Sequence, residues 1–164
     1  MEDSPAHDIE LYPLETFITL LNHEVNRSRR YEQPLTLLHL AFETKPADPQ
    51  TRYSAEIFII NVLNLRLRDT DIPCKKDNEF LVLMPATDEQ GGRMACERLE
   101  TLFPAGSQSY DRVSFELSVY VGMATLPGDR SISSKKLLHN AAQALQHARM
   151  HRLKHAVIFS EIED

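Results

Sequence analysis

The residues best suited to chemistry lie at a charged turn that leads into an apolar segment. The turn contains two lysines, one acid and one amide, namely Lys75, Lys76, Asp77 and Asn78. The apolar segment that follows covers residues 80–84. Carboxylates bind hard cations and lysines neutralise phosphate, so a charged tip on a buried strand pair is a common site of such chemistry. The pattern predicts a β-hairpin over residues 68–85 with a tip suited to phosphate or metal chemistry.

Two other groups of residues are similar to functional motifs. His147 and His151 lie one helical turn apart, a spacing that lets two imidazoles share a zinc ion. No carboxylate or cysteine follows at a suitable spacing, which favours a solvated helix face. Gly91 and Gly92 stand where a helix should begin, but they lack the lysine and hydroxyl residue of a phosphate-binding loop. A simple helix entry is the better interpretation of these glycines.

Composition and charge exclude several classes of protein. The chain has 164 residues, 42% of them hydrophobic, which is enough for one domain with a core of its own. Its formal net charge of −6 opposes binding to a nucleic-acid backbone or to an anionic membrane. No apolar run reaches the roughly 18 residues of a membrane span, and the acidic N-terminus is unlike a secretory signal. We therefore expect a cytoplasmic protein.

The cysteines and the first ten residues complete this outline. Cys74 and Cys96 fit no metal spacing and no disulfide framework, so both are expected to be reduced thiols without a functional role. Residues 1–10 are polar and are expected to form a flexible leader, followed by a single domain over residues 11–164. So short a leader leaves no room for a sensory domain. The input is then expected from a partner protein, a ligand or chain beyond this sequence.

Apolar spacing predicts four helices and several strands. Helices are expected at residues 14–25, 52–68 and 89–102, and from a serine cap at 131, 133 or 134 to about residue 149. Strands are expected at residues 35–42, 80–84, 114–126 and 156–159, with one more before the charged turn. Residues 26–33 are expected to be a polar segment outside the first helix, and residues 44–50 a loop.

In this order the elements form a βαββαβ core. That is the ferredoxin-like or palm-type plan, an α/β (α+β) arrangement with a central, mostly antiparallel sheet and helices packed against it. An extra helix precedes the core, and a helix with a short strand follows it.

Four segments, in this order and at these distances, carry a family resemblance. They are RSRRYEQPLTLLHLAFE, then RDTD with NEFLVLMPATDEQGGRMACERL, then SVYVGMATLP, and finally LLHNAAQALQHARMHRLKHAVIFS. Over about residues 11–160 the chain resembles a GGDEF domain, the fold of bacterial diguanylate cyclases. The resemblance implies the palm-type fold and a role in cyclic di-GMP signalling.

The signature turn of that family is altered in this chain. The resemblance implies two glycines that let guanine and phosphate approach the backbone, followed by an acid that holds metal. Aligned on Phe80, the chain has at the four preceding positions Lys76, Asp77, Asn78 and Glu79. The side chains of Lys76 and Asp77 would fill the space of the nucleotide, and the turn loses the φ freedom of glycine. Asn78 replaces the acid, and a neutral amide is a poor ligand for a hard cation.

The second metal carboxylate of the family corresponds to Ala41, which cannot ligate an ion. Glu43 lies two residues further on, on the same side of an extended strand. Arg149 corresponds to a lysine that contacts phosphate in the family. Joining two nucleoside triphosphates depends on metal-neutralised charge and an activated 3′-hydroxyl. The resemblance therefore implies a member that is not an enzyme and has no metal, no Mg²⁺ and no other cofactor.

A second family site, which binds cyclic di-GMP and inhibits the cyclase, keeps its residue types. It begins with Arg-x-x-Asp, here Arg68 and Asp71, and an arginine of the next helix joins it, here Arg98. Arginine forks can hold phosphate or the guanine edge, and a carboxylate can accept from guanine N–H groups. The alternative is structural: Arg68 ends a helix, Asp71 starts a turn and Arg98 pairs with an acid on its own helix.

Three functional hypotheses follow. The leading one is an inactive effector that binds cyclic di-GMP through Arg68, Asp71 and Arg98 and passes occupancy to a partner protein. The alternative is a ligand-free scaffold that keeps the fold as a protein-interaction or dimerisation surface, with the first helix as a candidate homodimer face. A residual cyclase that uses Glu43 and Glu79 is the third and least favoured hypothesis.

Overall fold

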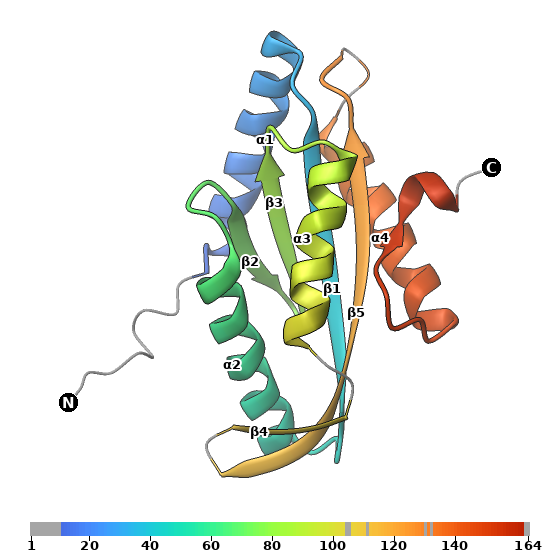
Figure 1. Ribbon diagram of the computed structural model, residues 1–164. Coiled ribbons are helices and arrows are strands. Elements are labelled where there is room, and N and C mark those ends of the chain that lie inside the picture. The colour runs from blue at the N-terminus through green and yellow to red at the C-terminus, as the bar shows by residue number, and fades with distance from the viewer. Residues whose placement is uncertain (1–10, 104–105, 111, 130, 132, 163–164) are drawn as a thin grey trace.

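A six-stranded sheet with helices on both faces organises the chain in the computed structural model (Figure 1). The structure describes residues 11–103, 106–110, 112–129, 131 and 133–162. The leader expected at residues 1–10 lies outside the described residues.

The order of the elements is that of the predicted core. The helices are α1 (Leu14–Tyr31), α2 (Pro49–Arg66), α3 (Glu89–Leu102) and α4 (Ser134–Met150), with a 3₁₀ turn, η2 (Phe159–Glu161). The strands are β1 (Leu35–Lys45), β2 (Ile72–Lys76), β3 (Glu79–Pro85), β4 (Gly106–Tyr110), β5 (Val113–Leu126) and β6 (Val157–Ile158). The succession β1-α2-β2-β3-α3-β5 confirms the βαββαβ plan, with α1 before it and α4 and β6 after it.

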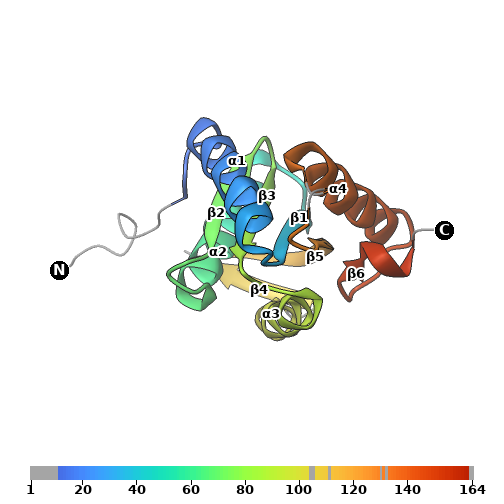
Figure 2. The same ribbon diagram turned by 90° about the horizontal axis from the view of Figure 1, so that it is seen from above.

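Strand β1 lies at the centre of the sheet. The strand order is β2-β3-β1-β5-β4, all neighbours being antiparallel, and the short β6 pairs with β5 in parallel. Seen from above, α1 and α4 cover one face of the sheet and α2 and α3 cover the other (Figure 2). Both faces of β1 are therefore covered, which explains its nearly continuous apolar sequence.

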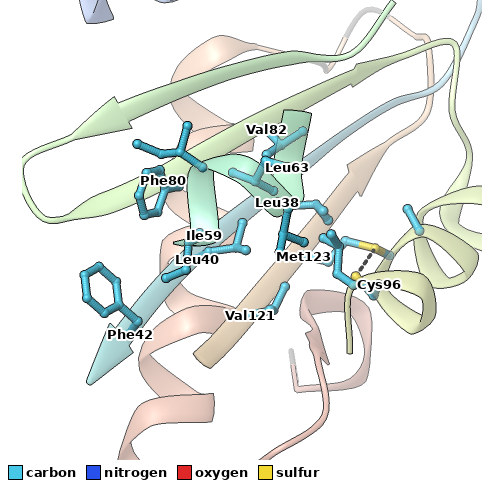
Figure 3. Packing of buried hydrophobic residues seen from close by; sticks show 14 of the residues in the cluster. Leu38, Leu40, Phe42, Ile59, Leu63, Phe80, Val82, Cys96, Val121 and Met123 are labelled. Carbon is cyan, nitrogen blue, oxygen red and sulfur yellow. Dashed lines mark hydrogen bonds between the residues drawn. The ribbon is translucent and has the colours of Figure 1, made fainter. Parts of the chain in front are cut away.

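The alternation of β1 divides the core between the two faces. Leu38, Leu40 and Phe42 join a large cluster with residues of α2, α3 and β3 (Figure 3). Leu35 and Leu37 belong to a second cluster with α1 and α4 on the opposite face. The next residues on that opposite face contribute to the candidate site described below.

Helix α1 is longer than the sequence predicted, because residues 26–31 continue it. Ser28 is buried, so the core-facing side of the helix extends past Val25. Arg29 and Arg30 lie in the last turn, where cations interact favourably with the helix dipole. The prediction of a polar segment outside the helix was wrong for these residues. The C-cap that follows the helix is Glu32, which adopts the left-handed conformation with a φ of 54°.

Other boundaries also differ from the prediction. Strand β1 continues to Lys45 because its pairing with β5 continues to that residue. Helix α2 begins at Pro49, a favoured first-turn residue, and its N-cap Asp48 accepts a hydrogen bond from the Thr51 backbone N–H at 3.1 Å. The helix ends at Arg66, so Arg68 lies beyond it. Strand β4 was not predicted, because its polar sequence carries no strand pattern and is held by pairing with β5 and by Tyr110, whose hydroxyl accepts from Asn61 of α2.

Within the described residues, no helix is both long and apolar enough to cross a bilayer.

Candidate functional site

The hairpin of β2 and β3 carries the signature positions at its tip. Lys76 pairs with Glu79 across the turn, and Asp77 and Asn78 form the turn itself. Asp77 has a φ of 56°, the left-handed conformation that favours glycine. The side chains of Lys76, Asp77 and Asn78 are exposed around the turn. The charged tip predicted from the sequence is thus present, with exposed side chains at all three positions.

Glu79 is held by two basic side chains. Its Oε1 lies 2.7 Å from His39 Nε2 on β1, and its Oε2 lies 3.0 Å from Arg149 Nη1 on α4. These three residues line one hollow between the sheet and α4, together with Gln146 and Met150. Both carboxylate oxygens therefore have partners from within the protein itself.

His39 is a buried histidine in the central strand. Burial lowers its pKa below the ordinary value, and the hydrogen bond to Glu79 only partly opposes this effect. The imidazole is therefore neutral at pH 7, and its Nε2–H donates to the carboxylate. Its Nδ1 is buried and lacks a hydrogen-bond partner among the described residues. His39 acts as a fixed donor that positions Glu79.

Ala41 is 4% exposed and belongs to a small apolar cluster between β1, β5 and α4. It is paired across the sheet with Tyr120, and Ala144 of α4 packs in the same cluster. Glu43 lies further along the strand, where its Oε1 is 3.3 Å from Arg152 Nη2. The position that the resemblance aligns with the second metal carboxylate is thus part of the packing, and the acid nearest to it along the strand has an arginine partner.

These residues do not fit the divalent metal that the family resemblance implies. A hard cation needs several oxygen ligands and gains from their negative charge. Ala41 offers no oxygen and Asn78 offers only an amide, while an arginine neutralises each of Glu43 and Glu79. Groups of three or more His, Cys, Asp or Glu side chains able to hold a metal are also absent from the part of the chain that the structure describes.

Arg68 and Asp71 form a closed turn after α2. Asp71 Oδ2 accepts from the Arg68 backbone N–H at 2.9 Å, and Oδ1 accepts from Arg68 Nη2 at 3.3 Å. The same Nη2 donates to Thr87 Oγ1 at 2.7 Å. The Asp71 side chain is only 1% exposed, whereas that of Arg68 is 53% exposed. The carboxylate therefore faces inward and holds the guanidinium, and Asp71 closes a turn that begins at Arg68, whereas the structural alternative expected Asp71 to start one.

Arg98 lies on the exposed side of α3 and completes this region. It lines a hollow of about 200 Å³ with Arg68, Thr87, Gly91 and Met94. No hydrogen bond or ion pair engages the Arg98 guanidinium among the described residues. The expected pairing with an acid on its own helix is therefore not seen there. The structure brings the two arginines to one hollow, and Asp71 lies behind Arg68 without lining it.

The remaining candidates have structural explanations. The imidazole centroids of His147 and His151 are 4.4 Å apart at the end of α4, and no third metal ligand accompanies them within the described residues. Gly91 donates its backbone N–H to the carboxylate of Asp88, the N-cap of α3, at 2.8 Å. The helix-entry interpretation of the glycine pair is confirmed.

Sequence reasoning missed three residues that shape these sites, namely His39, Thr87 and Arg152. His39 carried a signal, because a histidine interrupts an otherwise apolar stretch of a central strand. Thr87 and Arg152 carried none, since their partners Arg68 and Glu43 are 19 and 109 positions away in the sequence.

Comparisons with known proteins bear on the same region. The family model for "Diguanylate cyclase, GGDEF domain" matches residues 48–155. A comparison with curated proteins finds no match.

Solved structures show the same fold at low sequence identity. The GGDEF domain of DgcB from Caulobacter crescentus, in complex with c-di-GMP, has 12% identity and a TM-score of 0.77, covering 98% of each chain. The active GGEEF domain of a diguanylate cyclase from Vibrio cholerae has 14% identity and a TM-score of 0.73, covering 86% of this chain and 92% of that one. SiaD from Pseudomonas aeruginosa, in complex with its activator SiaC, has 18% identity and a TM-score of 0.71, covering 88% of this chain and 57% of that one.

Proposed function

This chain belongs to the GGDEF domain family, and on that basis we propose that it is a catalytically inactive member that acts by binding cyclic di-GMP. One observation carries the proposal: the two sites implied by the family have opposite characters here. At the catalytic positions, acids are either replaced or paired with arginine. At the second site, two arginines line an open hollow.

The ion pairs on the catalytic side support inactivity. Formation of a phosphodiester from two triphosphates needs metal ions to neutralise phosphate charge and to activate the attacking hydroxyl. A metal at Glu79 would have to displace Arg149 or His39, and a metal at Glu43 would compete with Arg152 for one of the two carboxylate oxygens. Neither Ala41 nor Asn78 supplies a carboxylate to compensate for those losses. We therefore expect neither Mg²⁺ binding nor cyclase activity.

The chemistry of the other hollow suits an anionic nucleotide. Arg98 presents an exposed guanidinium, and Arg68 presents one that is half exposed. Two such forks can bind phosphate oxygens or the Hoogsteen edge of guanine. Met94, which is 51% exposed, adds a polarisable apolar surface for a base. The hollow is small, so the ligand would lie across it and remain partly in solvent.

The buried carboxylate sets the order of importance among the predicted ligand residues. Asp71 cannot meet a guanine N–H while the Arg68 guanidinium covers it. We assign direct contact to Arg68 and Arg98, and a positioning role to Asp71 in the unliganded protein. A guanine N–H can donate to Asp71 only if the Arg68 guanidinium moves away from the carboxylate.

The DgcB domain gives this proposal a structural parallel, since that protein was solved with c-di-GMP bound and has the same fold. The alternative is a scaffold that binds a partner protein or a second copy of itself without ligand. SiaD, which has this fold and was solved with its activator SiaC, is the parallel for that alternative. Exposed apolar side chains such as Leu65 on α2 and Met150 on α4 would then be candidate contacts.

Titration calorimetry with cyclic di-GMP tests the proposal. The wild type should release or absorb heat with saturation, and Arg98→Ala should weaken binding by roughly 10- to 100-fold, as expected for loss of a charged hydrogen bond. Arg66→Ala is the matched control, because Arg66 is an exposed arginine at the end of α2 that makes no contact of this kind among the described residues. It should bind like the wild type. A wild type that shows no heat at tens of micromolar ligand excludes the receptor function.

Incubation with GTP tests inactivity separately. With Mg²⁺ or Mn²⁺ present, chromatography should detect no cyclic di-GMP above the level of a protein-free control. Steady product formation that scales with protein concentration would refute the assignment as a non-enzyme and restore the residual cyclase hypothesis, with Glu43 and Glu79 as the residues to substitute next.

A further inference from the structure

Arg68 is the wall between two hollows of the molecule. One is the hollow that it shares with Arg98. The other, of about 560 Å³, lies between the end of α2, the start of β2 and residues 11–13, which we call the N-terminal strap. Asp71 and Tyr12 both line this second hollow. A change at Arg68 therefore alters the lining of both hollows, although only one of them faces the proposed ligand.

The strap is attached to the start of β2. The Tyr12 backbone N–H donates to the Pro73 carbonyl oxygen at 2.9 Å, and Tyr12 forms a parallel bridge with Cys74. Helix α1 begins directly after the strap, with the Phe17 N–H donating to the Pro13 carbonyl oxygen at 2.9 Å. The position of the strap thus depends on where β2 begins.

The Arg68–Asp71 contact closes the turn that leads into β2. Asp71 directly precedes the strand, and its carboxylate is 1% exposed. If the guanidinium leaves, the backbone N–H of Arg68 is the one donor that the carboxylate keeps among the described residues. A buried carboxylate that loses its charged partner must recruit water or move toward solvent. The adjacent space is the second hollow, where Tyr12 forms part of the lining.

We propose that Arg68 couples occupancy of the arginine hollow to the N-terminal strap. A phosphate or guanine that draws the guanidinium from Asp71 and Thr87 weakens the turn before β2. The Tyr12–Pro73 hydrogen bond then opens more often, and the strap and the first turn of α1 are released together. This inference rests on the proposed function for the identity of the ligand, and it names the segment through which binding is reported to a partner.

Hydrogen exchange of the Tyr12 amide, followed by NMR, tests the coupling without any ligand. Arg68→Ala should accelerate exchange of this amide about tenfold, the effect expected when a charged hydrogen bond that supports a local structure is removed. Arg66→Ala should leave it unchanged, and the amides of β1 should not respond in either variant. If Arg68→Ala does not fold, Arg68→Gln removes the same charge while keeping most of the stem. Equal Tyr12 exchange in the Arg68 and Arg66 variants overturns the proposal.

A second arm adds cyclic di-GMP to the wild type and to Arg98→Ala. Saturating ligand should accelerate Tyr12 exchange in the wild type, and the effect should disappear in Arg98→Ala at the same ligand concentration. Binding heat without any change at Tyr12 would overturn the coupling and leave the receptor function intact. Absence of binding heat would overturn the receptor function, and the ligand-free comparison would still decide whether Arg68 controls the strap.

Discussion

At the residue scale, two positions that correspond to the catalytic site of the family, Ala41 and Glu79, have partners within the protein. Ala41 packs beside Tyr120 in an apolar cluster, and Glu79 bridges His39 and Arg149. A carboxylate that would otherwise attract a cation is here an acceptor for two basic side chains. The same logic applies to Asp71, whose oxygens hold the turn together. These carboxylates hold parts of the fold together, so substitutions near them should change the free energy of unfolding.

His39 should make the protein sensitive to mild acid. Burial lowers its pKa in the folded state, so the unfolded chain binds the proton more readily. The free energy of unfolding should therefore fall as the pH drops below the ordinary histidine pKa, through the interval down to the lowered value. Glu79, Lys76 and Arg149 are the charged groups that act on the imidazole. Urea titrations at several pH values between 7.5 and 5 should show this slope.

The variant His39→Gln should flatten that slope, because glutamine keeps a donor for Glu79 but does not titrate. His139→Gln, on the exposed side of α4, is the matched control and should keep the wild-type slope. A His39 variant whose stability depends on pH like that of the wild type would show that another group governs the acid sensitivity.

At the element scale, close packing of α4 on the sheet fixes the hollow that His39, Glu79 and Arg149 line. Gly122 of β5 lies directly under the helix, where an added Cβ would come within 2.6 Å of the Ala141 carbonyl oxygen and would also strike the backbone of Leu145. Backbone atoms cannot rotate away as a side chain can. The position of Arg149 near Glu79 therefore depends on a residue without a side chain in the strand below.

Gly122→Ala should lower the free energy of unfolding by about 3 kcal/mol, the upper part of the range for overpacking a core. Urea denaturation measures the effect. The control Gly91→Ala, in the first turn of α3, meets side-chain atoms alone, the Thr87 methyl group at 3.1 Å and Asp88 Oδ1 at 3.4 Å, and gains helix propensity, so its change should stay within about 1 kcal/mol. A Gly122→Ala variant that loses no more free energy of unfolding than Gly91→Ala would mean that α4 can shift without cost.

The sequence predicted elements well where a local signal marks both ends. Helix α3 has the predicted bounds, because Asp88 caps it and its apolar residues repeat with helical spacing. Strand β4 and the last turns of α1 were missed, because sheet pairing and core contacts hold them. In the second site, residue types pointed to Arg68 and Arg98, but the inward orientation of Asp71 depends on tertiary packing that no spacing encodes.

At the scale of the whole molecule, the two cysteines report on the two faces of the sheet. Cys74 packs in the cluster with α1, and Cys96 packs in the cluster with α2 and α3 (Figure 3). Burial raises the pKa of each thiol to about 12, so neither is a thiolate at neutral pH. Their reactivity can therefore show whether the faces open together.

The native protein should be nearly inert to a thiol reagent at pH 8. Both cysteines should react in urea, with native rates lower by on the order of 10³ or more, since reaction awaits opening of the core. Mass spectrometry of labelled peptides should show equal protection of Cys74 and Cys96 if the domain unfolds as one unit. Faster labelling of Cys74 alone would show that the α1 face opens by itself.

The pairing of Glu79 with Arg149 also bears on whether a metal site could be restored in this chain. An aspartate at position 41 would enter an apolar cluster and be destabilising there, and Glu79 would still be paired with Arg149. On the proposed function, restoring a metal site would therefore take more than one substitution, because the pairs that Arg149 and Arg152 make with Glu79 and Glu43 would have to open as well.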